Sequence, residues 1–155
     1  MVETTKDQAT PERLRDAPGY VVRRLYQAYT AAWGHHVDST LTGPQFAVLT
    51  AVWTYPGVDQ GSLAASVALD RSTMADVCRR LEDRGLIRRE TAPGDGRRKL
   101  LHLTEVGTGL QQTVAERVDR LNHYLMSDDA EPPALIDRLD KLSHHWESIS
   151  HDERL

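Results

Sequence analysis

Hydrophobic residues recur with a helical period along much of the chain. Between positions 18 and 37, five mostly aromatic residues recur at steps of four and three, so they share one face of a predicted helix: Val22, Tyr26, Tyr29, Trp33 and His36. Two similar stripes predict a long helix from 105 to about 126 and a last helix from about 133: Leu110, Val114, Val118, Leu121 and Leu125, then Leu135, Leu139, Leu142, Trp146 and Ile149. A small central module cannot cover all three faces, so we expect them to pack in a homodimer.

The middle of the chain predicts shorter helices with clear start signals. Thr42 and Gln45 have the spacing of a capping box, in which each side chain binds the other residue's backbone N–H. Two short helices are predicted over 60–67 and 71–84, and Asp70 is placed as the N-cap of the second. Four residues of that second helix form its inward face at helical spacing: Met74, Val77, Cys78 and Leu81.

A β-hairpin is predicted after the short helices. Gly85 suits the position just after a helix, and strands are expected at 86–90 and 100–103. Between them lies the stretch Gly-Asp-Gly-Arg-Arg-Lys at 94–99, and Thr104 then caps the long helix. Helix, turn, helix and hairpin is the order of a winged helix-turn-helix. The predicted fold class is therefore mainly α with a small β-hairpin, flanked by N- and C-terminal dimerisation helices.

Charge is distributed unevenly over the 155 residues. The formal net charge is −4, yet positions 71–99 contain nine Arg and Lys against five Asp and Glu. A basic segment on an acidic protein indicates a local surface for a polyanion. In a winged helix, the second short helix enters the major groove and the hairpin reaches the adjacent minor groove, where negative potential is concentrated. The basic loop alone would suit a solvated turn, but together with the cationic helix before it, it indicates DNA.

The sequence resembles the MarR family of dimeric winged-helix transcription regulators. The resemblance runs from about Gly19 to Ile149 and depends on three motifs: Leu41-Thr42-x-x-Gln45, then Asp70-Arg-Ser-Thr-Met-x-x-x-x-Arg-Arg-Leu-Glu-x-x-Gly-Leu-Ile87, then Asp95-x-Arg97 followed by Leu103-Thr104. It implies interlocked terminal helices that hold two recognition helices over a pseudo-palindromic operator in double-stranded DNA. The expected organisation has four parts: a flexible segment at 1–16, a dimerisation helix and ligand-pocket wall at 17–40, the winged helix-turn-helix at 41–104, and dimerisation helices at 105–155.

The expected DNA contacts lie on the second short helix and the hairpin, or wing. Ser72 and Thr73 stand at the helix N-terminus, where free backbone N–H groups would help to bind phosphate or a base. Asp76 either accepts a hydrogen bond from a cytosine amino group or points away from DNA. The resemblance implies that Asp95 braces the wing by pairing with an arginine and that Arg97 enters the minor groove. The full predicted set is Arg71, Ser72, Thr73, Asp76, Arg79, Asp95, Arg97 and Arg98.

A candidate effector site lies on the first long helix. Many family members release DNA when a small molecule, often an aromatic acid, binds between the dimer and winged modules, and positions 18–45 are similar to regulators that sense aromatic acids or their coenzyme A thioesters. A guanidinium can hold a carboxylate in two parallel hydrogen bonds, and aromatic rings supply a flat apolar wall. The predicted set is Arg23, Tyr26, Tyr29, Trp33 and His36. The same face is also typical of a dimer core, with Arg23 in solvent or paired with acidic residues of the other subunit.

Other classes of function fit the sequence less well. Cys78, the single cysteine, lies on an inward face, which favours a buried thiol over an oxidation sensor. Neighbouring histidines on a helix point about 100° apart, so the pairs His35-His36 and His144-His145 are poor metal sites. No phosphate loop or triad motif is present, so we expect a protein that is not an enzyme and has no metal or cofactor. A redox- or metal-responsive regulator of the same fold and a winged-helix interaction module are the alternatives.

The hydropathy of the chain bears on its location. No apolar run approaches the about 18 residues of a membrane-spanning helix, and the N-terminal residues contain no hydrophobic signal core. We therefore expect a cytoplasmic protein with no membrane partner.

Overall fold

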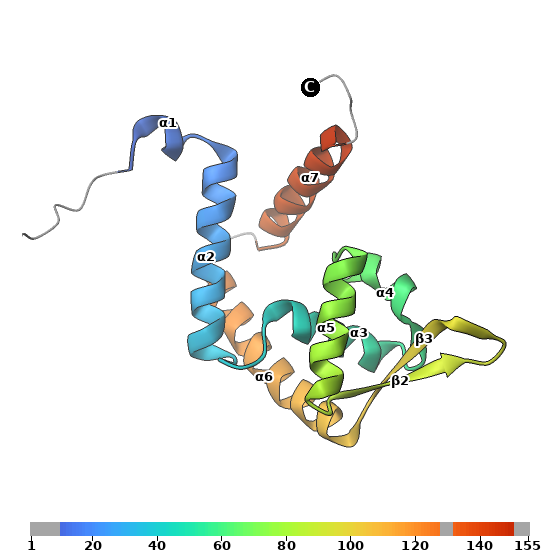
Figure 1. The fold of residues 1–155 in the computed structure, drawn as a ribbon. Coiled ribbons are helices and arrows are strands. Elements are labelled where there is room, and N and C mark those ends of the chain that lie inside the picture. The colour runs from blue at the N-terminus through green and yellow to red at the C-terminus, as the bar shows by residue number, and fades with distance from the viewer. Residues whose placement is uncertain (1–9, 128–131, 151–155) are drawn as a thin grey trace, which may run out of the picture. The chain divides into compact units, whose positions relative to one another are not determined.

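Helices form most of the fold, and a small sheet extends from the winged region (Figure 1). The structure is a computed structural model that describes residues 10–127 and 132–150. Two compact units are distinguished, one ending at Ala115 and the other beginning at Glu116. The elements in chain order are α1 (Glu12–Arg15), α2 (Pro18–His36), α3 (Gly43–Thr54), β1 (Val58–Asp59), α4 (Gln60–Ser66), α5 (Arg71–Asp83), β2 (Ile87–Ala92), β3 (Asp95–Leu103), α6 (Glu105–Ser127) and α7 (Pro132–Ser150).

The predicted helix starts are confirmed at the level of single hydrogen bonds. Both bonds of the capping box between Thr42 and Gln45 are present at the start of α3. At the start of α6, the hydroxyl of Thr104 accepts from the backbone N–H of Gly107 at 3.0 Å. The N-terminal segment differs from the prediction, because 12–15 form the short helix α1; the part of the predicted flexible segment at 1–9 lies outside the described residues.

The sheet is larger than the predicted hairpin. It has three antiparallel strands in the order β1-β3-β2, with Val58 opposite Leu101 and Arg88 opposite His102. β2 and β3 extend closer to the turn than predicted, because backbone pairing continues through exposed polar residues whose pattern carries no apolar alternation. The turn itself needs Gly94, whose φ of 79° is in the left-handed region.

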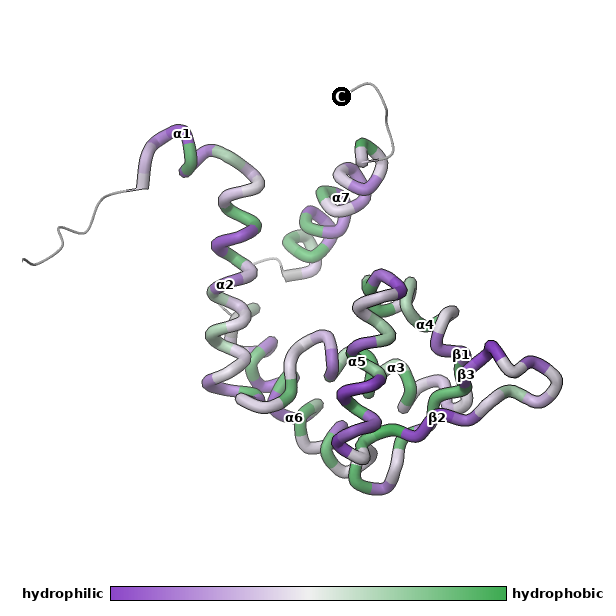
Figure 2. Tube along the Cα trace, viewed as in Figure 1, coloured by the Kyte–Doolittle hydropathy of each residue, from purple (hydrophilic) through white to green (hydrophobic). Residues whose placement is uncertain are grey.

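The core of the winged unit forms under α5. The predicted inward face of α5 is confirmed, since its four apolar residues are buried: Met74, Val77, Cys78 and Leu81. Figure 2 shows hydrophobic and hydrophilic positions alternating along α5. The helix ends at Asp83 and Arg84 is its C-cap; Gly85 follows with a φ of 67°, and the backbone N–H of Leu86 donates to the carbonyl of Leu81. This closed end fixes the direction in which β2 leaves α5.

The start of α6 packs tightly on the base of the wing. The hydroxyl of Thr104 donates to the carbonyl of Gly85 at 2.6 Å, and its backbone N–H donates to the carbonyl of Leu86 at 3.1 Å. A Cβ added at Gly107 would lie 1.9 Å from the Leu86 oxygen, so only glycine fits there. The junction therefore holds the wing base against the first turn of α6.

The helical stripes predicted for dimerisation are only partly covered in the single chain. On α2, Trp33 is buried, whereas the side chain of Tyr26 is 61% exposed. On α6, Val114 and Leu121 are buried; the side chain of Leu125 lies outside the described residues. The dimer that would cover the remaining apolar faces stays a prediction. Along the described residues, no helix is long and apolar enough to cross a membrane.

Candidate nucleic-acid interface

The N-terminus of α5 is closed by its own N-cap residue. One carboxylate oxygen of Asp70 accepts from the backbone N–H groups of Ser72 and Thr73, each at 2.9 Å. The hydroxyls of Ser72 and Thr73 also donate to this carboxylate, at 2.7 and 2.6 Å. These bonds, above all the one from the Thr73 hydroxyl, hold the pKa of Asp70 far below its usual range. The free N–H groups expected at this helix end are therefore absent at Ser72 and Thr73, because the cap uses them.

Asp76 lies on the exposed face of α5, where it makes a contact that neither of its two predicted roles included. Arg79 donates to the Asp76 carboxylate at 3.0 Å, and both side chains are more than half exposed. The spacing of three residues on a helix brings them together. Asp76 therefore orients Arg79 in the free protein, and it reduces the net charge that this part of the helix presents to DNA.

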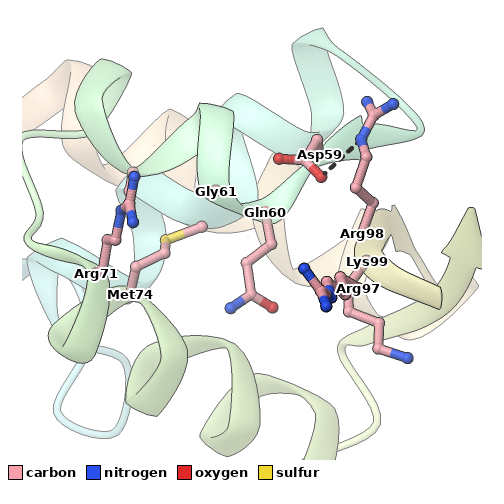
Figure 3. Close-up of a pocket in the computed structure, with 9 residues that line it drawn as sticks. Asp59, Gln60, Gly61, Arg71, Met74, Arg97, Arg98 and Lys99 are labelled. Atoms are coloured by element: carbon pink, nitrogen blue, oxygen red, sulfur yellow. Dashed lines mark hydrogen bonds and ion pairs between the residues drawn. The ribbon is translucent and has the colours of Figure 1, made fainter. Parts of the chain in front are cut away.

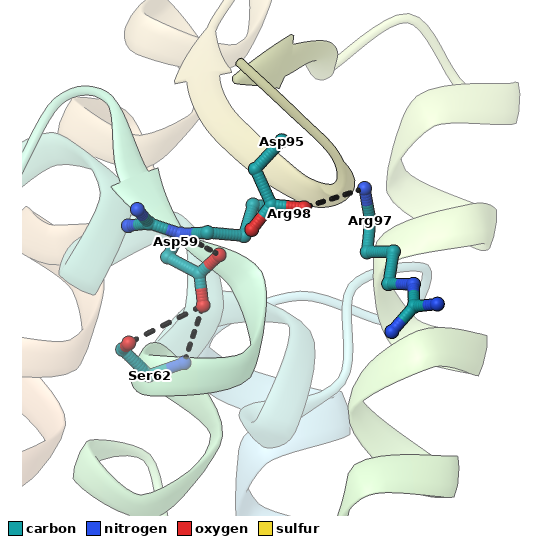
Figure 4. A network of polar contacts seen from close by, with 5 residues as sticks. All are labelled: Asp59, Ser62, Asp95, Arg97 and Arg98. Carbon is teal, nitrogen blue, oxygen red and sulfur yellow. Dashed lines mark hydrogen bonds and ion pairs between the residues drawn. The ribbon is translucent and has the colours of Figure 1, made fainter. Parts of the chain in front are cut away.

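The wing is braced differently from the expectation for Asp95. Asp95 accepts from the backbone N–H of Arg97 at 3.0 Å, which shapes the turn, and no guanidinium pairs with it among the described residues. The brace is instead Arg98 on β3, whose Nε donates at 3.3 Å to Asp59 on the adjacent strand β1. Asp59 also accepts from the backbone N–H of Ser62 at 3.0 Å as the N-cap of α4. Figure 4 shows Arg98 directed toward Asp59 and Arg97 directed away from it.

The hydrogen bonds of Asp59 lower its pKa. The bond from the Ser62 backbone has the largest effect, and Arg98 adds to it, so the carboxylate stays charged at neutral pH. The carboxylate thus links the start of α4 to the wing strand β3. This assigns Arg98 a structural contact in the free protein, in contrast to the outward-facing Arg97.

A cavity of about 300 Å³ opens between α4, α5 and the wing. In Figure 3, Arg71 and Met74 of α5 lie on one side, Arg97 and Lys99 of the wing on the other, and Gln60 extends between them. The side-chain oxygen of Gln60 is buried and has no hydrogen-bond partner in the described part of the chain. The cations of this cavity are suited to an anionic oxygen group, whereas the unpaired Gln60 oxygen is an acceptor and would need a hydrogen-bond donor.

Three residues of this region were missed by the sequence analysis as members of a site: Asp59, Gln60 and Lys99. Asp59 has a local signal, because an aspartate three residues before a serine at a helix start is typical of an N-cap. Lys99 belongs to the basic loop, and its ammonium donates to the Thr91 hydroxyl across the hairpin at 2.8 Å. Gln60 carries no signal in the sequence, because only the fold brings it into the cavity.

A second cavity, of about 320 Å³, lies beside the C-terminal half of α2 and the start of α3. Three of the five residues predicted for an effector pocket line it: Tyr26, Tyr29 and Trp33. The indole N–H of Trp33 donates to the carbonyl of Leu41 at 2.6 Å, and its ring lies 6.0 Å from that of Tyr29, centroid to centroid. Burial, with the neighbouring Tyr26, raises the pKa of Tyr29, so its hydroxyl stays protonated at neutral pH.

The other two predicted effector residues do not line this cavity. The guanidinium of Arg23 lies over the ring of Tyr20, 5.7 Å from its centroid. His36 is exposed, with its ring 6.4 Å from that of His35. Within one chain, the cavity wall thus contains aromatic rings, hydroxyls and the carboxylate of Asp38, but no cation.

The structure also bears on the residues of the alternative redox and metal sensors. Cys78 is fully buried, and burial raises the pKa of its thiol to about 11, which disfavours the reactive thiolate. Among 10–127 and 132–150, no group of three His, Cys, Asp or Glu residues is arranged to hold a metal ion.

Comparisons with known proteins agree with this architecture. The MarR family model matches residues 41–99. The transcriptional regulator HosA of Escherichia coli O111:H- is 39% identical over 94 residues, which are 61% of this chain and 69% of HosA. The structure of the PcaV transcriptional regulator from Streptomyces coelicolor, in complex with its natural ligand, is 36% identical, with a TM-score of 0.82 over 88% of this chain and 98% of PcaV.

A third relative connects the fold to control by a small molecule. BpsR of Bordetella bronchiseptica, whose DNA binding is regulated by 6-hydroxynicotinic acid, is 29% identical, with a TM-score of 0.71 over 81% of this chain and 97% of BpsR. The capped recognition helix, the braced wing and these similarities lead to one assignment: the chain is a winged-helix, DNA-binding transcriptional regulator and belongs to the MarR family.

Proposed function

We propose that the protein is a homodimeric repressor that a small aromatic carboxylate, or its coenzyme A thioester, releases from a pseudo-palindromic operator. The observation that carries the proposal is the pair of cavities in one unit, one cationic beside the recognition helix and one aromatic beside α2. The first supports binding to the DNA backbone, and the second supports recognition of a flat, largely apolar molecule.

The cationic cavity would receive a backbone phosphate. Arg71 approaches from the recognition helix and Arg97 and Lys99 approach from the wing, so one phosphate would contact two elements at once. Such a contact fixes the spacing of wing and recognition helix on the duplex, while Arg97 extends toward the minor groove.

The aromatic cavity would receive the effector ring. Tyr29 and Trp33 provide the flat walls, and a protonated Tyr29 hydroxyl provides a donor for a carboxylate oxygen. A charged partner for the carboxylate would come from Arg23 of a second copy, since Arg23 does not reach the cavity of its own chain. The exposed Leu25 and Tyr26 of α2 support a second copy at this helix, because large apolar side chains seldom remain in water over a continuous face.

The test is a titration of labelled DNA from the protein's own upstream region at several salt concentrations. Specific binding over scrambled DNA is expected, and Arg71→Ala should reduce the slope of log affinity against log salt by about 0.9, the value for one lost phosphate contact. Arg88→Ala is the matched control, because Arg88 pairs with Glu90 and does not line the cavity. Equal binding to specific and scrambled DNA would refute the operator, and an unchanged slope in Arg71→Ala would refute the phosphate contact.

The effector is tested by repeating the titration with benzoic acid, 6-hydroxynicotinic acid and benzoyl-coenzyme A. Release of DNA by one of these is the expected result, and Arg23→Ala should abolish that release while retaining DNA affinity. Binding that none of them disturbs, but that an oxidant or a metal ion abolishes, would replace the aromatic effector by the redox- or metal-responsive alternative.

A further inference from the structure

The C-terminal end of the recognition helix α5 is connected to the loop between α2 and α3. Arg84 is the C-cap residue of α5, and its Nη1 donates to the backbone carbonyl of Thr40 at 3.0 Å. Its Nη2 also lies 3.4 Å from the Thr40 hydroxyl oxygen. These bonds join positions 44 residues apart in the sequence, and a charged donor makes them stronger than neutral hydrogen bonds.

Thr40 is itself held in a tight turn. One carboxylate oxygen of Asp38 accepts from the backbone N–H of Thr40 at 2.6 Å, from its hydroxyl at 2.8 Å and from the backbone N–H of Leu41 at 2.7 Å. Three bonds to one oxygen make 38–41 a stiff segment, in which a displacement of one residue moves the others. The Thr40 hydroxyl donates to Asp38 and lies within reach of Arg84, so it belongs to both contacts.

The same turn forms a wall of the aromatic cavity. Asp38 and Leu41 line the cavity on either side of Thr40, and the Leu41 carbonyl accepts the indole N–H of Trp33. A ring that binds in this cavity against Tyr29 and Trp33 would therefore lie beside the turn to which Arg84 is hydrogen-bonded. The other end of α5 carries Arg71, at the cationic cavity.

We propose that Arg84 is a positioning residue that couples occupancy of the aromatic cavity to the placement of the recognition helix through its hydrogen bonds to Thr40. The inference deepens the proposed function, on which it rests. A ligand that prefers one arrangement of the 38–41 turn changes the position of the Thr40 carbonyl, and Arg84 passes that change to α5. A short rigid helix then moves its DNA-contacting N-terminus with its C-terminus.

Removing the guanidinium should leave the fold intact. Arg84 and Thr40 are both exposed, and the end of α5 is closed independently by the backbone bonds of Gly85 and Leu86. Surface substitutions of this kind change stability by about 0.5 kcal/mol or less. The link is therefore a contact whose loss affects communication rather than folding.

The experiment is a double-mutant cycle read by DNA affinity, so it needs no identified effector. Trp33→Phe removes the indole N–H that holds Leu41, and Arg84→Met removes the guanidinium but keeps an unbranched side chain. We expect Trp33→Phe to change operator affinity about fivefold with Arg84 present and by less than twofold in Arg84→Met. Arg80→Met is the control for loss of a charge on the same helix; there the Trp33→Phe effect should persist in full.

A second arm separates this inference from the proposed function. The wild type and Arg84→Met are titrated with 6-hydroxynicotinic acid and benzoic acid; binding is followed by isothermal titration calorimetry and DNA release is measured separately. If the acids bind both proteins but release DNA only from the wild type, the coupling role is supported. The coupling role would be overturned by equal release from both proteins. It would also be overturned if the two substitutions changed operator affinity by independent factors that multiply in the double mutant. If neither acid binds the wild type while the cycle is non-multiplicative, the proposed effector class fails and the Arg84 link stands.

Discussion

Two cavities of nearly equal volume, about 300 and 320 Å³, lie in the same unit and differ in almost every other respect. The cavity beside α5 is lined by exposed cations, such as Arg71 and Arg97. The cavity beside α2 is lined by aromatic rings, one of which, Trp33, is 5% exposed and hydrogen-bonded to the backbone. Equal volume therefore says little about function, whereas the lining separates a surface for polyanions from a site for a flat ligand.

The two cavities also differ in how they relate to the hydrophobic core. The aromatic cavity is bounded by the core, because Trp33 packs with its ring 5.7 Å from that of Phe46. The cationic cavity also has core residues in its wall, but its cations Arg71 and Arg97 are exposed. We conclude that changes in the aromatic rings of the first cavity should affect stability and ligand response together, whereas changes in these two cations should affect DNA affinity with little effect on stability.

Trp33→Ala should produce the largest effect that distinguishes the two cavities. Loss of a buried aromatic side chain and its hydrogen bond should lower the free energy of unfolding by about 4 kcal/mol. Arg97→Ala, its counterpart in the cationic cavity, should change that free energy by less than about 0.5 kcal/mol, because the side chain is exposed. Urea unfolding followed by circular dichroism, at one protein concentration, measures both. Similar unfolding midpoints for the two variants would show that the aromatic cavity is not part of the core.

Much of the fold and part of the candidate site could be predicted from the sequence, because these features depend on local chemistry. The capping box at Thr42, the cap at Asp70 and the inward face of α5 each depend on residues within one or two helical turns, and all three are confirmed. The clustering of Tyr29 and Trp33 also follows from helical spacing. The Asp76–Arg79 pair could have been predicted in the same way, since residues three apart on a helix are neighbours.

The contacts that could not be predicted join distant parts of the chain. Arg98 meets Asp59 across 39 positions. The N-cap signal of Asp59 and the basic loop that contains Arg98 are both local, and neither indicates the other residue as a partner. β1, with two residues, is too short for an alternating pattern, and its pairing with β3 depends on where α3 ends. The position of Arg23 over Tyr20, outside the aromatic cavity, likewise depends on side-chain direction, which helical spacing alone does not determine.

Gly107→Ala should affect both cavities, because both depend on the fold of the same unit. The expected loss of stability is somewhat smaller than that of Trp33→Ala. The new methyl group would lie 1.9 Å from the Leu86 carbonyl oxygen, so α6 must move away from the base of the wing. We expect the free energy of unfolding to fall by about 3 kcal/mol. Gly109→Ala is the matched control on the same helix: its Cβ meets no atom within 4 Å, and alanine should stabilise the helix by up to about 1 kcal/mol. Equal effects of the two substitutions would disprove the tight junction.

The smallest expected effect is a difference between the two regions in how the free energy of unfolding depends on pH. Near the cationic cavity, the pKa of Asp70 is lowered by the Thr73 and Ser72 bonds, so its stabilising effect is complete above the unfolded value near 4 and is lost as the pH falls below it. In the aromatic cavity, burial raises the pKa of Tyr29, so its stabilising effect is complete below pH 10 and is lost as the pH rises above it.

Two substitutions should remove these pH dependences one at a time. Asp70→Asn keeps an N-cap side chain but not the titrating group, so the fall in stability below about pH 4 should become shallower while the alkaline side is unchanged. Tyr29→Phe should do the opposite and flatten only the alkaline side. Thermal unfolding from pH 3 to 11 measures both. If each variant altered both sides of the profile, the recognition helix and the aromatic cavity would be one electrostatic unit, and the separation between the two regions would fail.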